Sequence, residues 1–400
     1  MPYPLRFAVN ARPLRKPVTG ISRYLSGLMR EVERDGRFAP HYFYSTHWSE
    51  GLDRAPGQLL GPNLMRLGGL LRAVDPLLRS VERRNFAAGL RGGNFAFYFE
   101  PTYLPFRTTL PTIITVHDLS HLRHPETHPA ARVRKFEREL PAAIARAACI
   151  LTPSEFTRRE VIAEFGERPE RVVATPLGVD ATFFPRSRDE TAAVLGPLAL
   201  THGRYFLAVG TLEPRKNVAT TLAAHSRLPQ RVRTDYPLVV AGMSGWLNDA
   251  LSRQLEAARA RGEVRLLGHV GEEQLPLLYA GAAMLAYPSL YEGFGLPPLE
   301  AMASGVPVAV SDRASLPEVV GDAGILVDPY DIDGLTAAML RVVADPRSSA
   351  DMAARGIERA KAFTWERCAR MTMQAWEDAA VARSSSRGDS GPRGQAAKSM

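Results

Sequence analysis

The chain has 400 residues, of which 45% are hydrophobic, and it carries a formal net charge of +8. This content can bury two cores, since a domain usually holds about 100 to 200 residues, and it excludes a largely disordered chain. The apolar runs are shorter than the roughly 20 residues of a membrane-spanning helix, and the N-terminus resembles no secretory signal. We therefore expect a soluble protein that acts in the cytoplasm.

Arginine supplies almost all of the positive charge, because lysine occurs only at positions 16, 135, 216, 361 and 398. A basic chain can bind nucleic acid, an anionic membrane surface or phosphorylated substrates. Arginine and glutamate are interspersed in "ARVRKFEREL", which is typical of a solvated helix face, and no nucleic-acid-binding motif is present. We expect no nucleic-acid partner and keep weak peripheral contact with the inner membrane surface as an alternative.

In residues 1–195 the pattern predicts strands alternating with helices. The expected strands are "LRFAVN", "FAFYFE", "TIITVHD" and "CILTPS". Helical segments separate them, which indicates parallel strands with helices on both faces. Residues 45–95 predict helices of uncertain extent, and "QLLGPNLMRLGGLLRAV" could either pack within the domain or lie against a membrane.

The same rhythm restarts in a second domain, expected at residues 196–361. Its predicted strands are "YFLAVG", "YPLVVAG", "VRLLG", "AMLAYPS", "VPVAV" and "GILVDP". Residues 362–382 predict a terminal helix with an apolar stripe. Residues 383–400 are small, polar and charged, and we expect them to be disordered.

Doubly wound domains bind ligands at the carboxyl ends of their strands, so the residues directly after each strand are informative. "TLEPRKN" follows "YFLAVG" and places Arg215 beside Lys216. The planar fork of arginine and the mobile charge of lysine together suit the oxygens of a diphosphate. A solvated cation pair that caps a loop is the alternative.

The second informative segment, "YEGFGLPPLEAMASG", follows "AMLAYPS". Gly293 and Gly295 allow the backbone to approach a ligand, and the helix expected after them offers free N–H groups to an anion. Glu300 lies early in that helix, where its negative charge could simply interact favourably with the helix dipole. Alternatively, it could accept hydrogen bonds from a neutral diol such as a ribose. Glu292 lies nearer the reacting end of such a ligand.

These blocks, together with "TVHDLSHLRHPE", "TPSEFTRREV" and "PLGVD", resemble the signature segments of glycosyltransferase family 4 over about residues 7 to 380. The resemblance implies an α/β protein of GT-B fold, with two Rossmann-like doubly wound domains facing each other across a cleft. It also implies that the C-terminal helix crosses back to the first domain. The acceptor would meet mainly the N-terminal domain, and the second would hold the nucleotide-sugar donor.

The resemblance also assigns roles to matching residues. Glu300 would bind the donor ribose, and Glu292 and His117 would lie at the transferred sugar as catalytic residues. The donor diphosphate would be held by the side chains and backbone of a set made up of Gly20, Arg215, Lys216, Phe294, Gly295 and Leu296. Many family members have two glycines at the first-domain loop, whereas this chain has Thr19 before Gly20.

Other motifs do not favour metal or hydride chemistry. The "DID" sequence at residues 331–333 precedes a helical run and is better explained as a helix cap. The histidines of "HDLSHLRHPETH" are interrupted by prolines, and the two cysteines, Cys149 and Cys368, are far apart. "GFGLPP" lacks the third glycine of a dinucleotide fingerprint. We expect neither a bound metal nor a cofactor.

The sequence therefore predicts a retaining, metal-independent glycosyltransferase. The blocks are most similar to those of bacterial mannosyltransferases that build surface polysaccharide, which favours GDP-mannose as donor and a glycan or lipid-linked saccharide as acceptor. A UDP- or dTDP-sugar donor is one alternative. A catalytically silent sugar-nucleotide-binding partner in an assembly complex is another.

Overall fold

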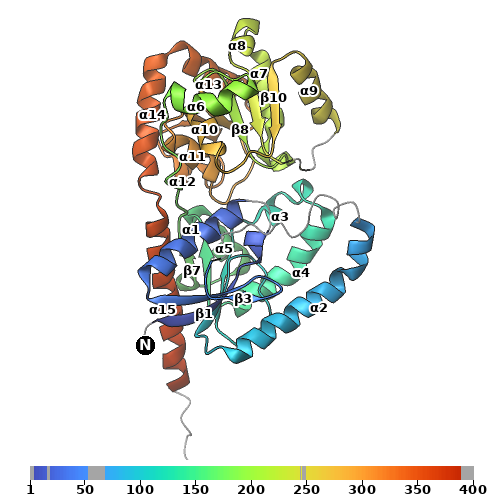
Figure 1. Cartoon of the computed structure of the whole chain (residues 1–400), viewed down its shortest axis with the longest axis vertical. Helices are drawn as coiled ribbons and strands as arrows, with labels where there is room; N and C mark the ends of the chain where they lie inside the picture. The colour runs from blue at the N-terminus through green and yellow to red at the C-terminus, as the bar shows by residue number, and fades with distance from the viewer. Residues whose placement is uncertain (1–3, 16–18, 53–67, 244, 246–248, 389–400) are drawn as a thin grey trace, which may run out of the picture.

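The computed structural model describes residues 4–15, 19–52, 68–243, 245 and 249–388. They form two α/β units, one above the other in Figure 1, each built around a sheet whose strands are almost all parallel. Helices cover both faces of each sheet, which explains why the central strands are buried. The predicted fold class of two doubly wound sheets is confirmed.

The first unit contains a seven-stranded sheet of order β3-β2-β1-β4-β5-β6-β7, in which only β3 is antiparallel. Its strands are β1 (Leu5–Asn10), β2 (Phe38–Phe43), β3 (Trp48–Ser49), β4 (Phe97–Glu100), β5 (Thr112–Thr115), β6 (Cys149–Thr152) and β7 (Val172–Ala174). Its helices are η1 (Arg12–Arg15), α1 (Gly20–Asp35), α2 (Gly68–Gly92), α3 (Ser120–Arg123), η3 (Pro125–Thr127), α4 (Ala130–Arg146), α5 (Glu155–Phe165) and η4 (Pro169–Arg171).

The second unit contains a six-stranded parallel sheet of order β10-β9-β8-β11-β12-β13. Its strands are β8 (Phe206–Val209), β9 (Leu238–Ala241), β10 (Val264–Gly268), β11 (Met284–Tyr287), β12 (Val308–Ser311) and β13 (Ile325–Val327). The other elements are α6 (Arg188–Leu195), η5 (Gly196–Leu198), η6 (Pro214–Lys216), α7 (Val218–Arg227), α8 (Gln230–Asp235), α9 (Asp249–Ala260), α10 (Leu275–Ala280), α11 (Leu296–Ala303), α12 (Leu316–Val320), α13 (Ile332–Ala344), α14 (Pro346–Ala360) and α15 (Trp365–Gly388).

Every strand predicted from the sequence is present, but β2, β3 and β7 were missed. β2 contains Pro40, which has no N–H to donate and which argues against a strand in sequence. β3 and β7 are only two and three residues long, too short to show a periodic pattern. The boundary predicted at residue 196 also leaves α6 in the first domain, whereas α6 lies with α10 in the second unit.

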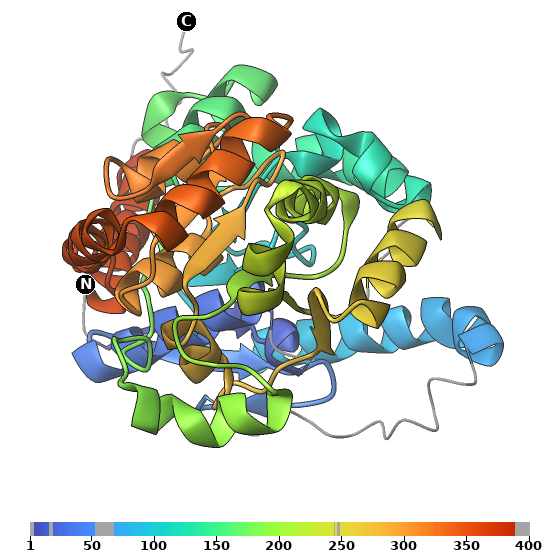
Figure 2. The same ribbon diagram turned by 90° about the horizontal axis from the view of Figure 1, so that it is seen from above.

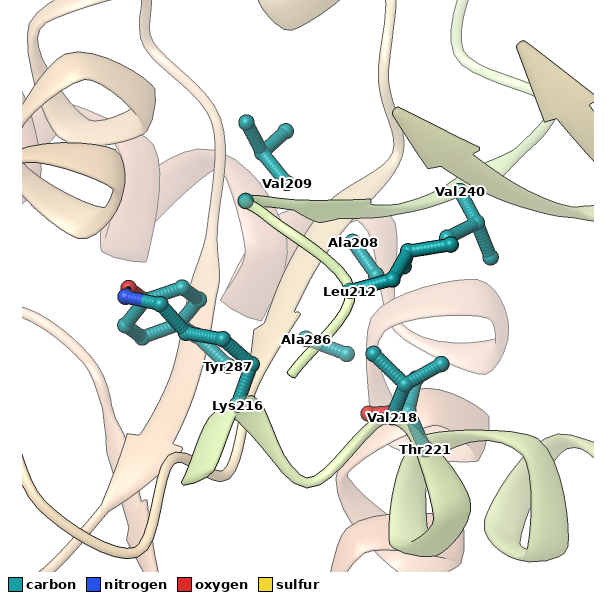
Figure 3. A pocket seen from close by; sticks show the side chains of 10 residues that line it. Ala208, Val209, Leu212, Lys216, Val218, Thr221, Val240, Ala286 and Tyr287 are labelled. Carbon is teal, nitrogen blue, oxygen red and sulfur yellow. Dashed lines mark hydrogen bonds between the residues drawn. The ribbon is translucent and has the colours of Figure 1, made fainter. Parts of the chain in front are cut away.

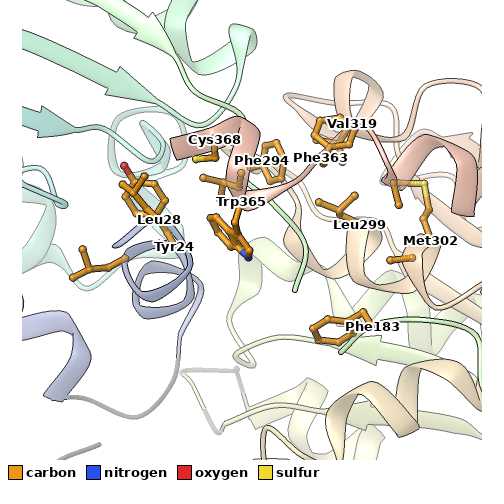
Figure 4. Close-up of a cluster of buried hydrophobic side chains, with 14 of the residues drawn as sticks. Tyr24, Leu28, Phe183, Phe294, Leu299, Met302, Val319, Phe363, Trp365 and Cys368 are labelled. Carbon is orange, nitrogen blue, oxygen red and sulfur yellow. The ribbon is translucent and has the colours of Figure 1, made fainter. Parts of the chain in front are cut away.

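The C-terminal helices run along one side of the molecule and join the two units (Figure 1). Seen from above, they lie at the edge of the molecule (Figure 2). Helix α15 leaves the second unit and packs on α1 and the first sheet, where the Trp376 ring lies 4.9 Å from that of Phe7 and 5.1 Å from that of Phe99. Trp365, at the start of α15, lies between Tyr24 of α1 and Phe294 of the second unit (Figure 4). One hydrophobic cluster thus runs through both units. Helix α15 continues to Gly388, and residues 389–400 of the predicted disordered tail lie outside the described residues.

The segment considered as a membrane contact is described only in part, because residues 53–67 lie outside the described residues. Phe86, in the second half of α2, is buried in a cluster with Phe43 and Tyr98, so this part of the helix packs on the first sheet. No helix in the described part of the chain has the length and apolarity needed to cross a bilayer. Cys149 and Cys368 are both buried and unpaired.

Replacing Trp376 by alanine should destabilise the protein strongly, because the ring is fully buried among aromatic rings of the first sheet. We expect the free energy of unfolding to fall by about 3 to 5 kcal/mol. Urea unfolding measures this change. Gln374→Ala, on the exposed face of the same helix, is the control; equal stability of the two variants would contradict the docking of α15.

Candidate active site

In the second sheet, successive strands are added on one side of β8 up to β10 and on its other side from β11 onward, so the strand order changes direction between β8 and β11. Doubly wound folds bind ligands at this switch point. The loop after β8 contains η6 with Arg215 and Lys216. The loop after β11 contains Glu292 and leads into α11, which carries Glu300. Residues separated by more than 70 positions in sequence therefore meet at one edge of the sheet.

Glu292 is held by both predicted cations. Lys216 Nζ donates to its Oε1 at 2.6 Å, and Arg215 Nη1 lies 3.0 Å from its Oε2. The Tyr287 hydroxyl also donates to Oε1, at 2.9 Å. Arg215 in turn pairs with Glu213 at 2.6 Å. A narrow cavity beside Lys216 and Tyr287 lies at the end of β8 (Figure 3). The charged cluster therefore lies at the carboxyl ends of β8 and β11.

The charges in this cluster are buried, since Glu292 and Arg215 are only 7% and 8% exposed. Burial disfavours the charged form of Glu292, but the charges of Arg215 and Lys216 outweigh it and lower its pKa to about 2. Burial also lowers the pKa of Lys216. The carboxylate is therefore ionised at neutral pH, and any anion that enters must compete with it for the two cations.

Glu300 lies in α11 and reaches the first unit, where it forms an ion pair with Arg23 of α1. It is 3% exposed, and burial raises its pKa although Arg23 acts in the opposite direction. The pair crosses the boundary between the units. A ribose that binds Glu300 must therefore displace or share Arg23.

The glycine loop of the first unit begins α1 and lies against the start of α11, because the Cβ position of Gly20 is 3.8 Å from Leu296 Cδ1. Thr19 is the N-cap of α1, with φ −131° and ψ 171°. Its backbone N–H and hydroxyl form a capping box with Ser22. Since this extended conformation suits any residue, threonine replaces the glycine common in the family without backbone strain.

His117 follows β5, and its Nε2 lies 2.8 Å from the carbonyl oxygen of Pro101. Because a carbonyl only accepts, Nε2 carries the proton and Nδ1 is free to act as an acceptor. Burial lowers the pKa of His117, so the ring is neutral at pH 7. Its backbone is adjacent to the loop of Glu292, because a Cβ on Gly293 would lie 1.7 Å from the His117 carbonyl oxygen.

The first unit also forms hydrogen bonds to the turn between Glu292 and α11. The hydroxyls of Ser154 and Thr157 donate to the carbonyl oxygen of Gly293 at 2.7 and 3.1 Å. Across the same boundary, the carboxylate of Glu318 accepts from the backbone N–H groups of Glu155 and Phe156, which begin α5. These contacts fix the turn relative to both units.

The predicted residues Phe294, Gly295 and Leu296 form the entry to α11. The Phe294 ring is buried against Phe363, so only its backbone can serve a ligand. Gly295 is the N-cap residue with φ 114°, a conformation that favours glycine, and Leu296 is the first helical residue. The first N–H groups of a helix have no partner within it, so this end can bind an anion.

Two further residues at the site were missed from the sequence. Arg23 was not recognised because its partner lies 277 positions away. Asp118 faces Arg215 from the first unit, and although burial opposes its ionisation, Arg215 and Ser120 lower its pKa to about 2. Its place directly after His117 and a strand was the signal that could have found it.

The rejected motifs have structural roles. Asp331 is the N-cap of α13, and its carboxylate accepts from the Gly334 N–H at 2.8 Å. Among the described residues, no three histidine, cysteine or acidic side chains converge as metal ligands. His128 instead contacts the Ser120 hydroxyl at 2.9 Å.

Two doubly wound units that meet where Arg215 and Lys216 lie beside Glu292, with Glu300 in the helix that follows, have the arrangement of a glycosyltransferase of the GT-B fold. The model for glycosyl transferases group 1 matches residues 198–361, and the model for Glycosyltransferase Family 4 matches residues 18–183. The O-antigen chain mannosyltransferase B of Escherichia coli is 39% identical over 389 residues, which cover 93% of this chain and all of that protein. The chain therefore belongs to glycosyltransferase family 4.

Solved structures show the same fold. The sucrose-phosphate synthase of Thermosynechococcus elongatus has a TM-score of 0.72 at 20% identity, covering 94% of this chain and 100% of that one. Anabaena HepE, solved in complex with UDP and glucose, has a TM-score of 0.69 at 18% identity, with 94% and 100% covered. At these identities the likeness supports the architecture alone.

Adding a methyl group at Gly293 should impair catalysis, because the new Cβ would collide with the His117 carbonyl oxygen. We expect Gly293→Ala to lower turnover by up to about 100-fold, since a displacement near 1 Å can cost that much. Gly196→Ala is the control, because its Cβ would meet no atom within 4 Å. Turnover equal to that of the control would show that the turn is not held as described.

Proposed function

We propose that this enzyme is a retaining mannosyltransferase that transfers mannose from GDP-mannose to a hydroxyl of a glycan or lipid-linked saccharide during surface polysaccharide synthesis. The observation that carries this proposal is the cluster of Arg215, Lys216 and Glu292, which lies after β8 and β11 and next to the start of α11. The similarity to the O-antigen chain mannosyltransferase B of Escherichia coli supports mannose as the transferred sugar and polysaccharide synthesis as the process.

The proposed chemistry follows from the charges. Negative charge develops on a phosphate oxygen as the glycosyl bond breaks, so cations and helix N–H groups aimed at it stabilise the transition state more than the ground state. The acceptor hydroxyl attacks from the leaving-group face and gives its proton to a phosphate oxygen. No nucleophilic carboxylate is needed, unlike in retaining hydrolases.

The remaining predicted residues have distinct roles in this scheme. Once the diphosphate occupies Arg215 and Lys216, Glu292 is released to the transferred sugar, where its charge offsets developing positive charge. His117 contributes a neutral acceptor, Nδ1, to a sugar hydroxyl. Glu300 accepts from the ribose diol in place of Arg23. Since two cations and α11 already neutralise the leaving group, we propose that activity requires no divalent metal.

Two alternatives remain distinct from this proposal. A UDP- or dTDP-sugar would use the same diphosphate contacts, because base and sugar are recognised by other residues. A silent binding partner would retain donor affinity without turnover. We place the enzyme in the cytoplasm, where nucleotide sugars are available, with peripheral contact with the membrane as a further possibility for a lipid-linked acceptor.

A panel of labelled nucleotide sugars tests the function. Without an acceptor, the pure protein should hydrolyse GDP-mannose slowly, but faster than it hydrolyses UDP- or dTDP-sugars. This activity should be retained in excess chelator. Turnover of another donor would correct the substrate, and loss of activity that magnesium restores would overturn metal independence. Donor binding without any turnover would favour the silent partner.

Lys216→Ala should weaken binding of GDP by roughly tenfold or more, because a hydrogen bond to a charged group contributes about 1.5 to 3 kcal/mol. Calorimetric titration measures the affinity. Lys361→Ala removes a surface lysine paired only with Glu358 and should leave the affinity unchanged. If both variants bind GDP as tightly as the wild type, Lys216 does not hold the diphosphate.

A further inference from the structure

A second hollow, of about 360 Å³, opens at the boundary between the two units. Its volume lies in the range of roughly 300 to 1,000 Å³ that is typical of small-ligand sites. Phe156 and Glu160 of α5 line it from the first unit, and Tyr291, Arg313 and Tyr330 line it from the second. None of these residues belongs to the donor site predicted from the sequence.

The hollow is rich in aromatic surface. Tyr330 is 69% exposed, an unusual position for a large ring. Deeper in the hollow, the Tyr291 ring lies 5.8 Å from Phe156 and 5.6 Å from His124. Flat apolar rings of this kind pack against the C–H faces of sugar rings and leave the sugar hydroxyls free for hydrogen bonds.

The polar groups of the hollow favour a neutral ligand. Arg123 is paired with Glu160 at 2.8 Å and with Glu164 at 3.0 Å. Arg313 is paired with Asp312 at 3.1 Å and also with Asp328. Because carboxylates already neutralise both guanidinium groups, a phosphate would gain little. A polyhydroxylated ring can instead hydrogen-bond to both members of each pair without separating them.

The backbone beside Arg313 is also unusual. Ala314, which lines the hollow, has φ +55°. This left-handed conformation is unfavourable for alanine, and such residues cluster at functional sites.

The hollow is connected to the reaction centre through one side chain. Tyr291 directly precedes Glu292, and its hydroxyl accepts from the Leu119 N–H at 3.1 Å, two residues after His117. The same hydroxyl donates to Glu160 in the wall of the hollow. A glycan bound here therefore lies beside the two segments that carry the predicted catalytic residues, Glu292 next to Tyr291 and His117 near Leu119.

We propose that this hollow binds a neutral oligosaccharide, namely the acceptor glycan at sugar units distant from the reacting hydroxyl. Tyr330 provides the stacking surface, and the Arg123–Glu160 and Arg313–Asp328 pairs provide hydrogen bonds. This inference rests on the proposed function, because it assigns the substrate class of the same reaction. It predicts that long acceptors bind better than short ones.

The test compares wild type, Tyr330→Ala and Phe184→Ala, the last being a control that removes another exposed ring outside the hollow. α-Linked mannotetraose and methyl α-mannoside serve as acceptors with GDP-mannose. Tyr330→Ala should raise KM for mannotetraose by roughly fivefold, the scale of one aromatic contact. KM for methyl α-mannoside and the rate of donor hydrolysis should not change, and the control should match the wild type.

Binding is also followed without catalysis, by saturation-transfer NMR of mannotetraose on the full chain. If mannotetraose contacts the wild type and Phe184→Ala but not Tyr330→Ala, the subsite is supported. This holds even if no donor is turned over, and in that case only the proposed function fails. The subsite is overturned if mannotetraose does not contact the wild type. It is also overturned if the wild type and Tyr330→Ala show equal contact and equal KM for mannotetraose. In either case, turnover of the donor leaves the proposed function intact.

Discussion

The buried ion pairs of Glu292 with Arg215 and Lys216 are the interaction on which the rest of the site depends. Removing three charges from water is costly, so the cluster is stable only because each charge has a close partner and Tyr287 adds a hydrogen bond. The two strand-end loops are therefore fixed to each other. In the function that we propose, this arrangement keeps two cations in place for the diphosphate and makes Glu292 its competitor.

The other contacts of the site hold the first unit against this cluster. The pair of Arg23 and Glu300, the hydroxyls on the Gly293 carbonyl and the docking of α15 all cross between the units. Glu300 lies in α11, and its ion pair with Arg23 crosses between the units. If the donor ribose takes the place of Arg23 as we propose, donor binding changes the bonding between the units.

The sequence predicts elements where one signal dominates. Apart from β2, β3 and β7, the strands of both sheets are apolar runs and were located correctly. The turn before α11 was also located, because it combines glycines at 293 and 295 with a proline in the first helical turn. Strand β2 was missed because Pro40 obscures it. Arg23, the partner of Glu300, could not be predicted, because it reaches the site only after the two sheets have formed and packed together.

Calorimetric titration of Glu292→Gln with GDP tests the central claim most directly, because it removes the competing charge but keeps the shape of the side chain. If Glu292 neutralises the two cations that hold the diphosphate, the variant should bind GDP more tightly than the wild type while its turnover of GDP-mannose falls. Weaker binding of GDP by Glu292→Gln would contradict the account, since it would show that the carboxylate supports the diphosphate site rather than competing for it.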